Sequence, residues 1–374
     1  MESTSPIVRV EEAGFVPTGG AARLALSQLP RADEVADAVR VARGVFHWVG
    51  ERLIVTAVPS RLVDAAGRVG GLVLAEQMRT AVEPAVDAWL AGAPDVTTPN
   101  GTLTTSKRPL VVGVLNVTPD SFSDGGVHFA GDAHPAEAIA AGRALAVAGA
   151  DLVDVGGEST RPGAEPVGVD EELARVVPVV EGLAGDGVAV SVDTTKAVVA
   201  RAAVEAGASM VNDVSAGTMD EALLPTVAEL GVPYVLMHMQ GTPRTMQADP
   251  RYEDVVGEVY DFLAAQLAQL DALGVARERV VVDPGIGFGK RLEHNLALLR
   301  RLREFTSLGR PILIGASRKS FVGQLTGTED PTDRLEGSLA AAALAVASGA
   351  RVLRVHDVAA TARAVAVAHA ITTG

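Results

Sequence analysis

The chain of 374 residues contains no cysteine, which excludes disulfides, thiolate metal sites and thiol catalysis. Its formal net charge of −14 argues against nucleic acid as the principal partner, because phosphate binding needs a basic surface. The longest run of small residues, 339–350, is too short to span a bilayer, and no signal peptide is visible. We therefore expect a cytoplasmic protein that acts on small molecules, with no membrane or nucleic-acid partner.

Lysine and aromatic residues are also scarce. Only four of the 32 basic residues are lysines, and aromatic residues make up 3% of the chain. Three of the lysines, Lys196, Lys290 and Lys319, each follow an apolar segment, in DTTK, GFGK and SRKS. A compact ammonium suits a site in which the broad fork of a guanidinium does not fit. Lys319 is accordingly the strongest single candidate for a site cation.

Short apolar segments that end in polar or glycine residues recur along most of the chain. The first, LVVGVLN, breaks at Asn116 into the polar loop VTPDSFSDGG, and loops of that kind carry chemistry more often than scaffolding does. Seven more segments end in the same way. The eight lie at residues 110–116, 151–157, 188–194, 209–215, 234–239, 279–285, 311–317 and 351–357.

The segments between these runs have helical spacing, and several close on Gly-Ala, at residues 149–150, 207–208 and 349–350. Glycine is the expected residue just past a helix end, and a new strand follows at once. Strands alternating with helices predict a parallel sheet, and eight such units predict a (β/α)8 TIM barrel. A doubly wound open sheet is the alternative, but no GxGxxG fingerprint follows the first strand.

The barrel predicts where a site would lie. Active sites of such barrels are built at the carboxyl ends of the strands. The residues that the sequence places at these ends are Asn116, Asp154, Asp193, Asn212, His238, Asp283, Ser317, Arg354 and His356.

The first hundred residues show no motif that carries chemistry. Residues 45–58 alternate like two short strands that meet at Gly50, and residues 62–90 are mostly helical in pattern. Residues 96–107 are rich in Thr, Pro, Asn and Gly, which is typical of a linker. We expect a small α/β accessory domain over residues 1–95, a linker over 96–107 and the barrel over 108–374.

Eight motifs in this order resemble the signatures of the dihydropteroate synthases, from about Lys107 to the C-terminus. They are GVLNVTPDSFSDGG, DVGGESTRPGA, SVDTTK, NDVS, LMHMQGTPRTM, DPGIGFGK, SRKS and RVHD. The resemblance implies condensation of 6-hydroxymethyl-7,8-dihydropterin pyrophosphate with para-aminobenzoate, which gives 7,8-dihydropteroate and pyrophosphate. It also implies Mg²⁺ as cofactor, a homodimer, and competition between sulfonamides and para-aminobenzoate.

By this resemblance, the pterin ring is read by Asp193, Asn212 and Asp283, with Lys319 reaching the ring's acceptors. Carboxylates and a carboxamide suit a flat ring edge with adjacent donors and acceptors. From the sequence alone, N-capping of a following helix remains open for both aspartates. Asn212 could equally be a turn residue.

The resemblance assigns the leaving pyrophosphate to Asn116, Arg354 and His356, and its bound Mg²⁺ to Asn116 as well. Arg354 and His356 alternate along one strand and so share a face. Growing charge on pyrophosphate needs cations and fixed donors, and Mg²⁺ commonly takes one protein oxygen together with phosphate oxygens. A core histidine is the alternative for His356.

The mechanism that the resemblance implies is dissociative, through a pterin-methyl cation that the aromatic amine then attacks. Asp124 resembles a residue that stabilises this cation, in one of two loops expected to close over the amine.

The resemblance also implies a para-aminobenzoate pocket, formed by Thr160, Arg161, Pro162, Phe122, Phe288 and Ser317. From the sequence alone, Phe288 could instead be a core residue. No role is assigned to His238.

Two other functions remain open. A corrinoid-dependent pterin methyltransferase shares the barrel and the pterin-reading acids, but it has no use for SRKS and RVHD. An inactive paralogue that only binds pterin should lose loop residues first, whereas Asp124, Thr160 and Arg161 are present.

Overall fold

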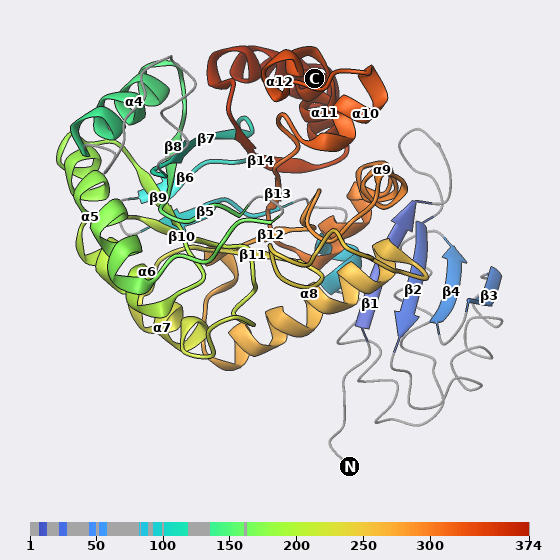
Figure 1. The fold of residues 1–374 in the computed structure, drawn as a ribbon. Coiled ribbons are helices and arrows are strands. Elements are labelled where there is room, and N and C mark those ends of the chain that lie inside the picture. The colour runs from blue at the N-terminus through green and yellow to red at the C-terminus, as the bar shows by residue number, and fades with distance from the viewer. Residues whose placement is uncertain are drawn as a thin grey trace. The chain divides into compact units, whose positions relative to one another are not determined.

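The computed structural model describes residues 7–12, 22–27, 45–49, 52–57, 82, 84–88, 93–98, 101–118, 135–160 and 163–373 (Figure 1). The chain forms two compact units. One comprises Met1–Ala93 together with Arg301–Arg310, and the other comprises Pro94–Arg300 together with Pro311–Gly374.

Eight parallel strands close into a barrel in the larger unit, each strand pairing with the next along the chain and the last with the first. The predicted (β/α)8 barrel is therefore confirmed, and the open sheet is excluded. The strands are β7 (Leu110–Asn116), β8 (Leu152–Gly156), β9 (Val190–Asp193), β10 (Met210–Asp213), β11 (Tyr234–Met237), β12 (Val280–Asp283), β13 (Ile312–Ile314) and β14 (Ala350–Val355).

Helices surround this barrel (Figure 1). Their apolar faces cover strands that are buried on both sides, which explains the nearly continuous apolar runs in the sequence. The helices are α4 (Pro135–Val147), α5 (Val169–Gly185), α6 (Ala197–Glu205), α7 (Leu223–Leu230), α8 (Val255–Ala272), α9 (Leu292–Arg300), α10 (Ser320–Thr326), α11 (Leu335–Ala347) and α12 (Val358–Thr373).

Glycine ends several of these helices, as the Gly-Ala signals predict. Gly149, Gly207 and Gly349 have φ of 105°, 113° and 103°, a region that side chains with a Cβ rarely adopt. At Gly207 a Cβ would also lie 2.6 Å from the Cβ of Ala184. Only glycine lets the chain turn here directly from helix into strand.

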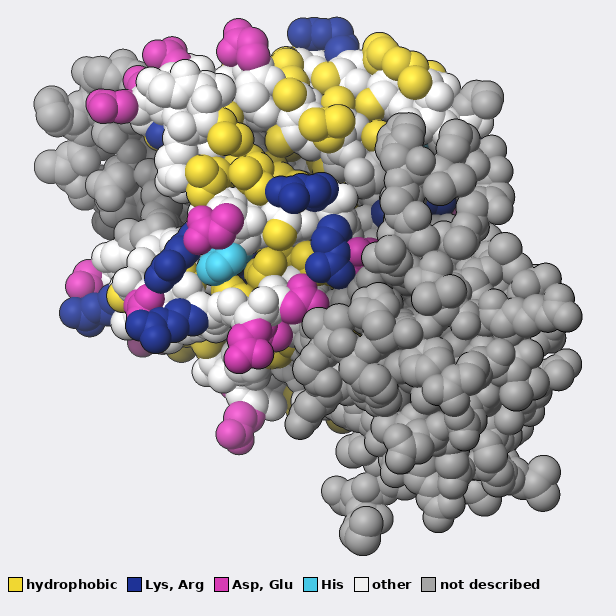
Figure 2. All heavy atoms as spheres, turned by 90° about the vertical axis from the view of Figure 1, so that its right-hand side faces the viewer, with side chains coloured by type: hydrophobic (Ala, Val, Ile, Leu, Met, Phe, Trp, Pro, Cys, Tyr) yellow, Lys and Arg dark blue, Asp and Glu magenta, His cyan; other side chains and the backbone are white. Residues whose placement is uncertain are grey.

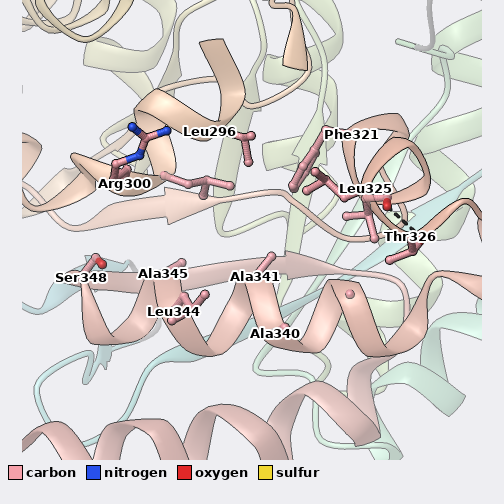
Figure 3. Close-up of a pocket in the computed structure, with 13 residues that line it drawn as sticks. Leu296, Arg300, Phe321, Leu325, Thr326, Ala340, Ala341, Leu344, Ala345 and Ser348 are labelled. Atoms are coloured by element: carbon pink, nitrogen blue, oxygen red, sulfur yellow. Dashed lines mark hydrogen bonds between the residues drawn. The ribbon is translucent and has the colours of Figure 1, made fainter. Parts of the chain in front are cut away.

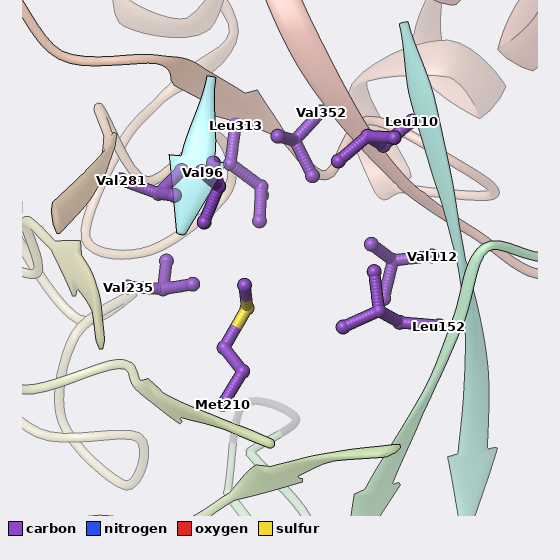
Figure 4. Packing of buried hydrophobic residues seen from close by; sticks show 9 residues of the cluster. All are labelled: Val96, Leu110, Val112, Leu152, Met210, Val235, Val281, Leu313 and Val352. Atoms are coloured by element: carbon purple, nitrogen blue, oxygen red, sulfur yellow. The ribbon is translucent and has the colours of Figure 1, made fainter. Parts of the chain in front are cut away.

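Packed apolar side chains fill the barrel at the end away from the polar rim (Figure 4). The buried cluster draws on strands all around the barrel, so this end is a core and not a pore. Its members are Val96, Leu110, Val112, Leu152, Met210, Val235, Val281, Leu313 and Val352.

Residues 96–107 differ from the expected linker. They contain a hairpin of β5 (Val96–Thr98) and β6 (Gly101–Leu103), in which Val96 and Leu103 are paired. Val96 belongs to the barrel core cluster and Leu103 packs against it. Two cross-strand apolar residues are enough to anchor a segment that otherwise has the composition of a loop, and the barrel unit therefore begins at Pro94.

The smaller unit holds an antiparallel sheet in the order β1-β2-β4-β3. Its strands are β1 (Ile7–Glu12), β2 (Ala22–Ser27), β3 (Val45–Val49) and β4 (Arg52–Ala57). The predicted pair of strands meeting at Gly50 is confirmed, since β3 and β4 pair antiparallel with Val49 opposite Arg52. A second difference from the expected boundaries is that Arg301–Arg310, which contains the 3₁₀ helix η3 (Leu302–Leu308), belongs to this unit.

Candidate active site

Asp154, in the middle of β8, is the hub of a hydrogen-bonded cluster inside the barrel, below the carboxyl ends of the strands. Its side chain is buried, with 1% exposed. One carboxylate oxygen accepts from the Ser191 hydroxyl, and the other accepts from Asn212 Nδ2 at 3.0 Å and from Arg354 Nε at 2.6 Å. A buried carboxylate is costly without such partners, so four strands are joined here by one charge-assisted network.

Asp193 lies in the same cluster. Its Oδ2 accepts from a terminal nitrogen of Arg354 at 2.7 Å. Burial raises the pKa of Asp193 to about 7; the Arg354 charge opposes this shift, and the nearby Asp154 carboxylate adds to it. The first N–H of the next helix, that of Ala197 in α6, donates to the Asp220 side chain and not to Asp193, so the capping interpretation of Asp193 does not hold.

Asp283, at the end of β12, is buried beside the cationic groups. Its Oδ1 accepts from the backbone N–H of Gly285 at 2.7 Å, and α9 begins only at Leu292, so Asp283 caps no helix either. Burial raises its pKa, while Lys319 opposes the shift. Burial therefore favours the protonated form of Asp283, and the nearby Lys319 ammonium favours the ionised form.

The ammonium of Lys319 lies 4.5 Å from the centre of the Phe288 ring and donates to the carbonyl of Ile286. Burial lowers its pKa to about 8, although Asp283 works in the opposite direction. The Phe288 ring is half-buried, so it lies at the edge of the site and is not a core residue. A Cβ at Gly315 would lie 3.9 Å from both Lys319 Nζ and the Cβ of Arg354, so these two side chains lie beside this glycine.

Ser317 and His356 are in contact across two strand ends. The Ser317 hydroxyl lies 3.1 Å from His356 Nδ1 and accepts from the His356 backbone N–H at 3.2 Å. Arg318 between Ser317 and Lys319 has φ of 58° and donates to both carboxylate oxygens of Asp357, at 3.0 and 2.7 Å. This bidentate pair locks the turn that presents Ser317 and Lys319.

Asn116 is half-buried at the end of β7, where an oxygen ligand could meet solvent and substrate. A Cβ at Gly156 would lie 3.7 Å from Asn116 Oδ1 and 3.7 Å from Asp193 Oδ2, so glycine leaves this space open. Within the described part of the chain, no three His, Cys, Asp or Glu side chains gather to hold a metal. One carboxamide oxygen next to open space fits a Mg²⁺ ion that takes most of its ligands from water and phosphate.

Several predicted residues lie outside the described part of the chain, namely Phe122, Asp124, Arg161 and Pro162. Thr160 is described and is half-buried in the loop that follows β8.

Sequence reasoning missed two groups. The sequence assigns Asp154 to the strand DLVDVGG, but nothing in that motif marks it as the residue that joins Ser191, Asn212 and Arg354. The other is His238, whose Nδ1 lies 3.0 Å from Lys290 Nζ and whose ring meets Phe262 edge-on at 4.9 Å. Nothing in the two motifs LMHM and GFGK indicates that they meet.

The comparisons with known proteins agree with this geometry. Residues 112–356 match the family model described as "Pterin binding enzyme". Dihydropteroate synthase of Escherichia coli (strain K12) is 48% identical over 271 residues, covering 72% of this chain and 94% of that protein. That of Mycobacterium leprae (strain TN) is 49% identical over 255 residues, covering 66% of this chain and 88% of that protein.

Solved structures are similar over the same region. The Yersinia pestis dihydropteroate synthase in complex with a sulfonamide drug matches with a TM-score of 0.70 and 44% identity, over 75% of this chain and all of that one. The Xanthomonas albilineans enzyme with 7,8-dihydropteroate matches with a TM-score of 0.67 and 45% identity, over 75% of this chain and 100% of that one. In the described ranges no helix is both long and apolar enough to cross a membrane. The chain belongs to the dihydropteroate synthases, within the pterin-binding enzyme family.

Proposed function

We propose that this chain condenses 6-hydroxymethyl-7,8-dihydropterin pyrophosphate with para-aminobenzoate, giving 7,8-dihydropteroate and pyrophosphate. The observation that carries this proposal is the meeting of Asp154, Asp193, Asn212 and Arg354 in one buried network inside the barrel. Related Xanthomonas albilineans structures hold 4-aminobenzoic acid and 7,8-dihydropteroate, which are a substrate and a product of this reaction.

The pterin ring is read by Asp193, Asn212 and Asp283, with Lys319 donating to a ring acceptor. All four side chains lie at strand ends or in the turn after β13, and the three from β9, β10 and β12 are buried. Such groups are costly while unpaired, so a ligand with complementary donors and acceptors gains both affinity and orientation.

The leaving pyrophosphate is held by Asn116, Arg354 and His356, and the Ser317 hydroxyl contacts the His356 ring. Asn116 would hold the Mg²⁺ ion, which supplies positive charge to the phosphate oxygens when it is bound. The guanidinium of Arg354 and the imidazole of His356 offer donors at the same rim, where charge on the departing group develops.

The reaction proceeds by a dissociative mechanism, in which the bond from the pterin methylene carbon to the pyrophosphate oxygen breaks before the amine attacks. The electron pair leaves with pyrophosphate, and the resulting cation is stabilised by the ring and by Asp124. No protein nucleophile is needed, so catalysis rests on position and electrostatics. The aminobenzoate pocket is formed by Thr160, Arg161, Pro162, Phe122, Phe288 and Ser317.

The protein acts as a cytoplasmic homodimer in this proposal. The groove between α9, α10 and α11 has a volume of about 490 Å³ (Figure 3). Leu325 and Leu344 beside it are 56% and 69% exposed, and hydrophobic side chains gather over the upper part of the face in Figure 2. A second copy of the chain would cover them, with small residues of α11 allowing close approach. Light scattering should give twice the chain mass, and Leu344→Glu should give a monomer.

The function is tested by following pyrophosphate release with the dihydropterin pyrophosphate, para-aminobenzoate and Mg²⁺. Release that requires both substrates supports the synthase, and sulfonamides should then inhibit in competition with para-aminobenzoate. Binding of the pterin without any release would favour an inactive paralogue. Methyl transfer to a corrinoid acceptor, without release, would favour the methyltransferase.

A further inference from the structure

The buried amine of Lys290 has no role in the chemistry proposed above. Its side chain is 3% exposed at the end of the motif GFGK. Nζ lies 3.0 Å from His238 Nδ1 and donates to the carbonyls of Phe288 at 3.0 Å and of His238 at 3.3 Å. Three acceptors match the three N–H bonds of an ammonium, so Lys290 is completely satisfied inside the protein and is not aimed at a ligand.

His238 is shaped for this contact. Its pKa is lowered well below the usual range, first by burial and then by the charge of Lys290. A neutral imidazole keeps one nitrogen free to accept, and Nδ1 is the nitrogen that faces the amine. The ring is also held by edge-on packing against Phe262, with centroids 4.9 Å apart. The two residues therefore form a rigid pair between β11 and the loop after β12.

The loop of residues 285–290, which contains Lys290, packs closely against the His238 backbone. Gly285 has φ of 71°, and a Cβ there would lie 1.9 Å from the carbonyl oxygen of His238, so the two backbones touch. The middle of the loop is tied by Gly287, whose N–H donates to Asn295 Oδ1 at 2.7 Å and whose carbonyl accepts from Gln247 Nε2 at 2.6 Å. These contacts leave little freedom to residues 285–290.

The same loop carries two groups of the candidate active site. The carbonyl of Ile286 accepts from Lys319 Nζ, and the ring of Phe288 lies 4.5 Å beneath that ammonium. The carbonyl of Phe288 accepts a hydrogen bond from Lys290 Nζ. A shift of the loop would therefore move the aromatic wall and the cation together.

We propose that Lys290 and His238 are a positioning pair that sets the loop of residues 285–290, and through it the Phe288 ring and the Lys319 ammonium. This role rests on the proposed function, because it assigns Phe288 to the aminobenzoate pocket and Lys319 to the pterin. Neither member of the pair touches a substrate. Lys290 works by fixing the Phe288 carbonyl, and His238 works by holding Lys290.

The first test is Lys290→Met in the full-length protein, with Lys107→Met as the matched control, since Lys107 is exposed. Lys290→Met should raise the KM for para-aminobenzoate and the Kd for a 6-hydroxymethylpterin about 10- to 100-fold, with a smaller fall in kcat. The control should leave all three unchanged. Unchanged KM and Kd in Lys290→Met would overturn the proposal, even if the melting temperature fell.

A chemical rescue is possible because the chain has no cysteine. Lys290→Cys introduces a single thiol, and aminoethylation in denaturant followed by refolding rebuilds a side chain with the length and charge of lysine. Wild-type protein taken through the same steps is the control. Recovery of the KM supports positioning by the amine, whereas refolded, aminoethylated protein with the KM of the unmodified variant would contradict it.

Variants of His238 keep the test decisive if Lys290→Met does not fold. His238→Asn places an acceptor oxygen near the position of Nδ1, whereas His238→Leu has none. The asparagine variant should keep a KM within about threefold of wild type while the leucine variant loses at least tenfold. Equal values would refute the pair. Pterin binding measured by calorimetry separates the two proposals. If the wild type shows no turnover, the synthase proposal is contradicted. The Kd values of the wild type and the Lys290 and His238 variants still test the positioning role.

Discussion

Arg354 donates to the Oδ2 of Asp154 at 2.6 Å across a separation of 200 residues in sequence. The contact spans the closure of the barrel, because β14 pairs with β7 and β7 pairs with β8. The guanidinium joins a second carboxylate, Asp193, at 2.7 Å. Arg354 is therefore both a proposed phosphate ligand and the counter-charge of two buried acids.

Arg354→Ala should weaken binding of the pterin pyrophosphate at least tenfold and change para-aminobenzoate binding much less, because a charged hydrogen bond is worth about 1.5–3 kcal/mol. It should also lower the free energy of unfolding by about 3 kcal/mol, since Asp154 and Asp193 lose their cation. Calorimetric binding and urea unfolding measure the two effects. Equal losses for both substrates would contradict the pyrophosphate assignment, and Arg354→Lys serves as the charge-conserving control.

Asp154→Asn should keep the hydrogen bonds of the hub, because its oxygen can face Arg354 and Asn212 while its NH₂ faces the Ser191 hydroxyl. The lost charge should lower the pKa of Asp193, since the Asp154 carboxylate raises it. We expect the acid limb of kcat/KM to move to lower pH, with the maximum reduced about tenfold by the weaker bond to Arg354. An acid limb that stays in place would show that Asp193 does not control it.

The pH profile should be bell-shaped. Asp193, with a pKa of about 7, must ionise, and Lys319, with a pKa of about 8, must stay protonated. Activity should therefore rise through about pH 7 and fall above about pH 8.

Lys319→Ala should abolish turnover and pterin binding together. Any activity left in Lys319→Arg should lack the alkaline fall, because arginine stays charged. An alkaline limb that persists in Lys319→Arg would refute the assignment.

These shifts also make stability depend on pH. The raised pKa of Asp193 means that the folded chain holds a proton that the unfolded chain loses between pH 3.8 and about 7, so its contribution to stability falls as pH rises there. The pKa of Lys319 is lowered to about 8 in the folded chain, so between about pH 8 and 10.5 the unfolded chain binds more protons than the folded chain. The contribution of Lys319 to stability therefore rises with pH in this range. Urea unfolding of wild type and Lys319→Met across this range measures the second effect.

Lys196 holds two carboxylates, Glu158 at the start of the loop with Thr160 and the completely buried Glu172 of α5. Lys196→Met should lower the free energy of unfolding by about 3 kcal/mol, because it leaves the buried Glu172 carboxylate without a cation. It should also raise the KM for para-aminobenzoate, because Glu158 at the start of the loop loses its partner. Adding Glu172→Gln should restore much of the stability but not the KM. A normal KM in Lys196→Met would contradict the anchoring of the loop.

Removal of Mg²⁺ with EDTA should stop pyrophosphate release, and added Mg²⁺ should restore it. Asn116→Ala should raise the Mg²⁺ concentration for half-maximal activity about tenfold, since one oxygen ligand is lost. Asn116→Asp, which keeps an oxygen, should need less Mg²⁺ than the alanine variant. If all three proteins required the same concentration, Asn116 would not be the metal ligand.

Much of the barrel could be predicted because its signals are local. Each strand is an apolar run that ends in a polar residue, and a glycine with positive φ after several helices marks the return to the sheet. Since parallel strands place their carboxyl ends on one rim, Asn116, Asp193, Asp283 and Arg354 could be assigned to a common site. Local signals failed where only two residues decided the outcome, as for Val96 and Leu103 in the hairpin under the barrel.

The amino-acid sequence by itself determined the strand and helix order, the rim that carries the polar side chains and the family. Only the tertiary structure decided which groups pair: Arg354 with Asp154 and Asp193, and Lys290 with His238. Those pairs depend on strand register and on barrel closure, which bring together residues that are 52 to 200 positions apart. A hydrogen bond acts only over about 3 Å, so no pattern along the chain could specify its partner.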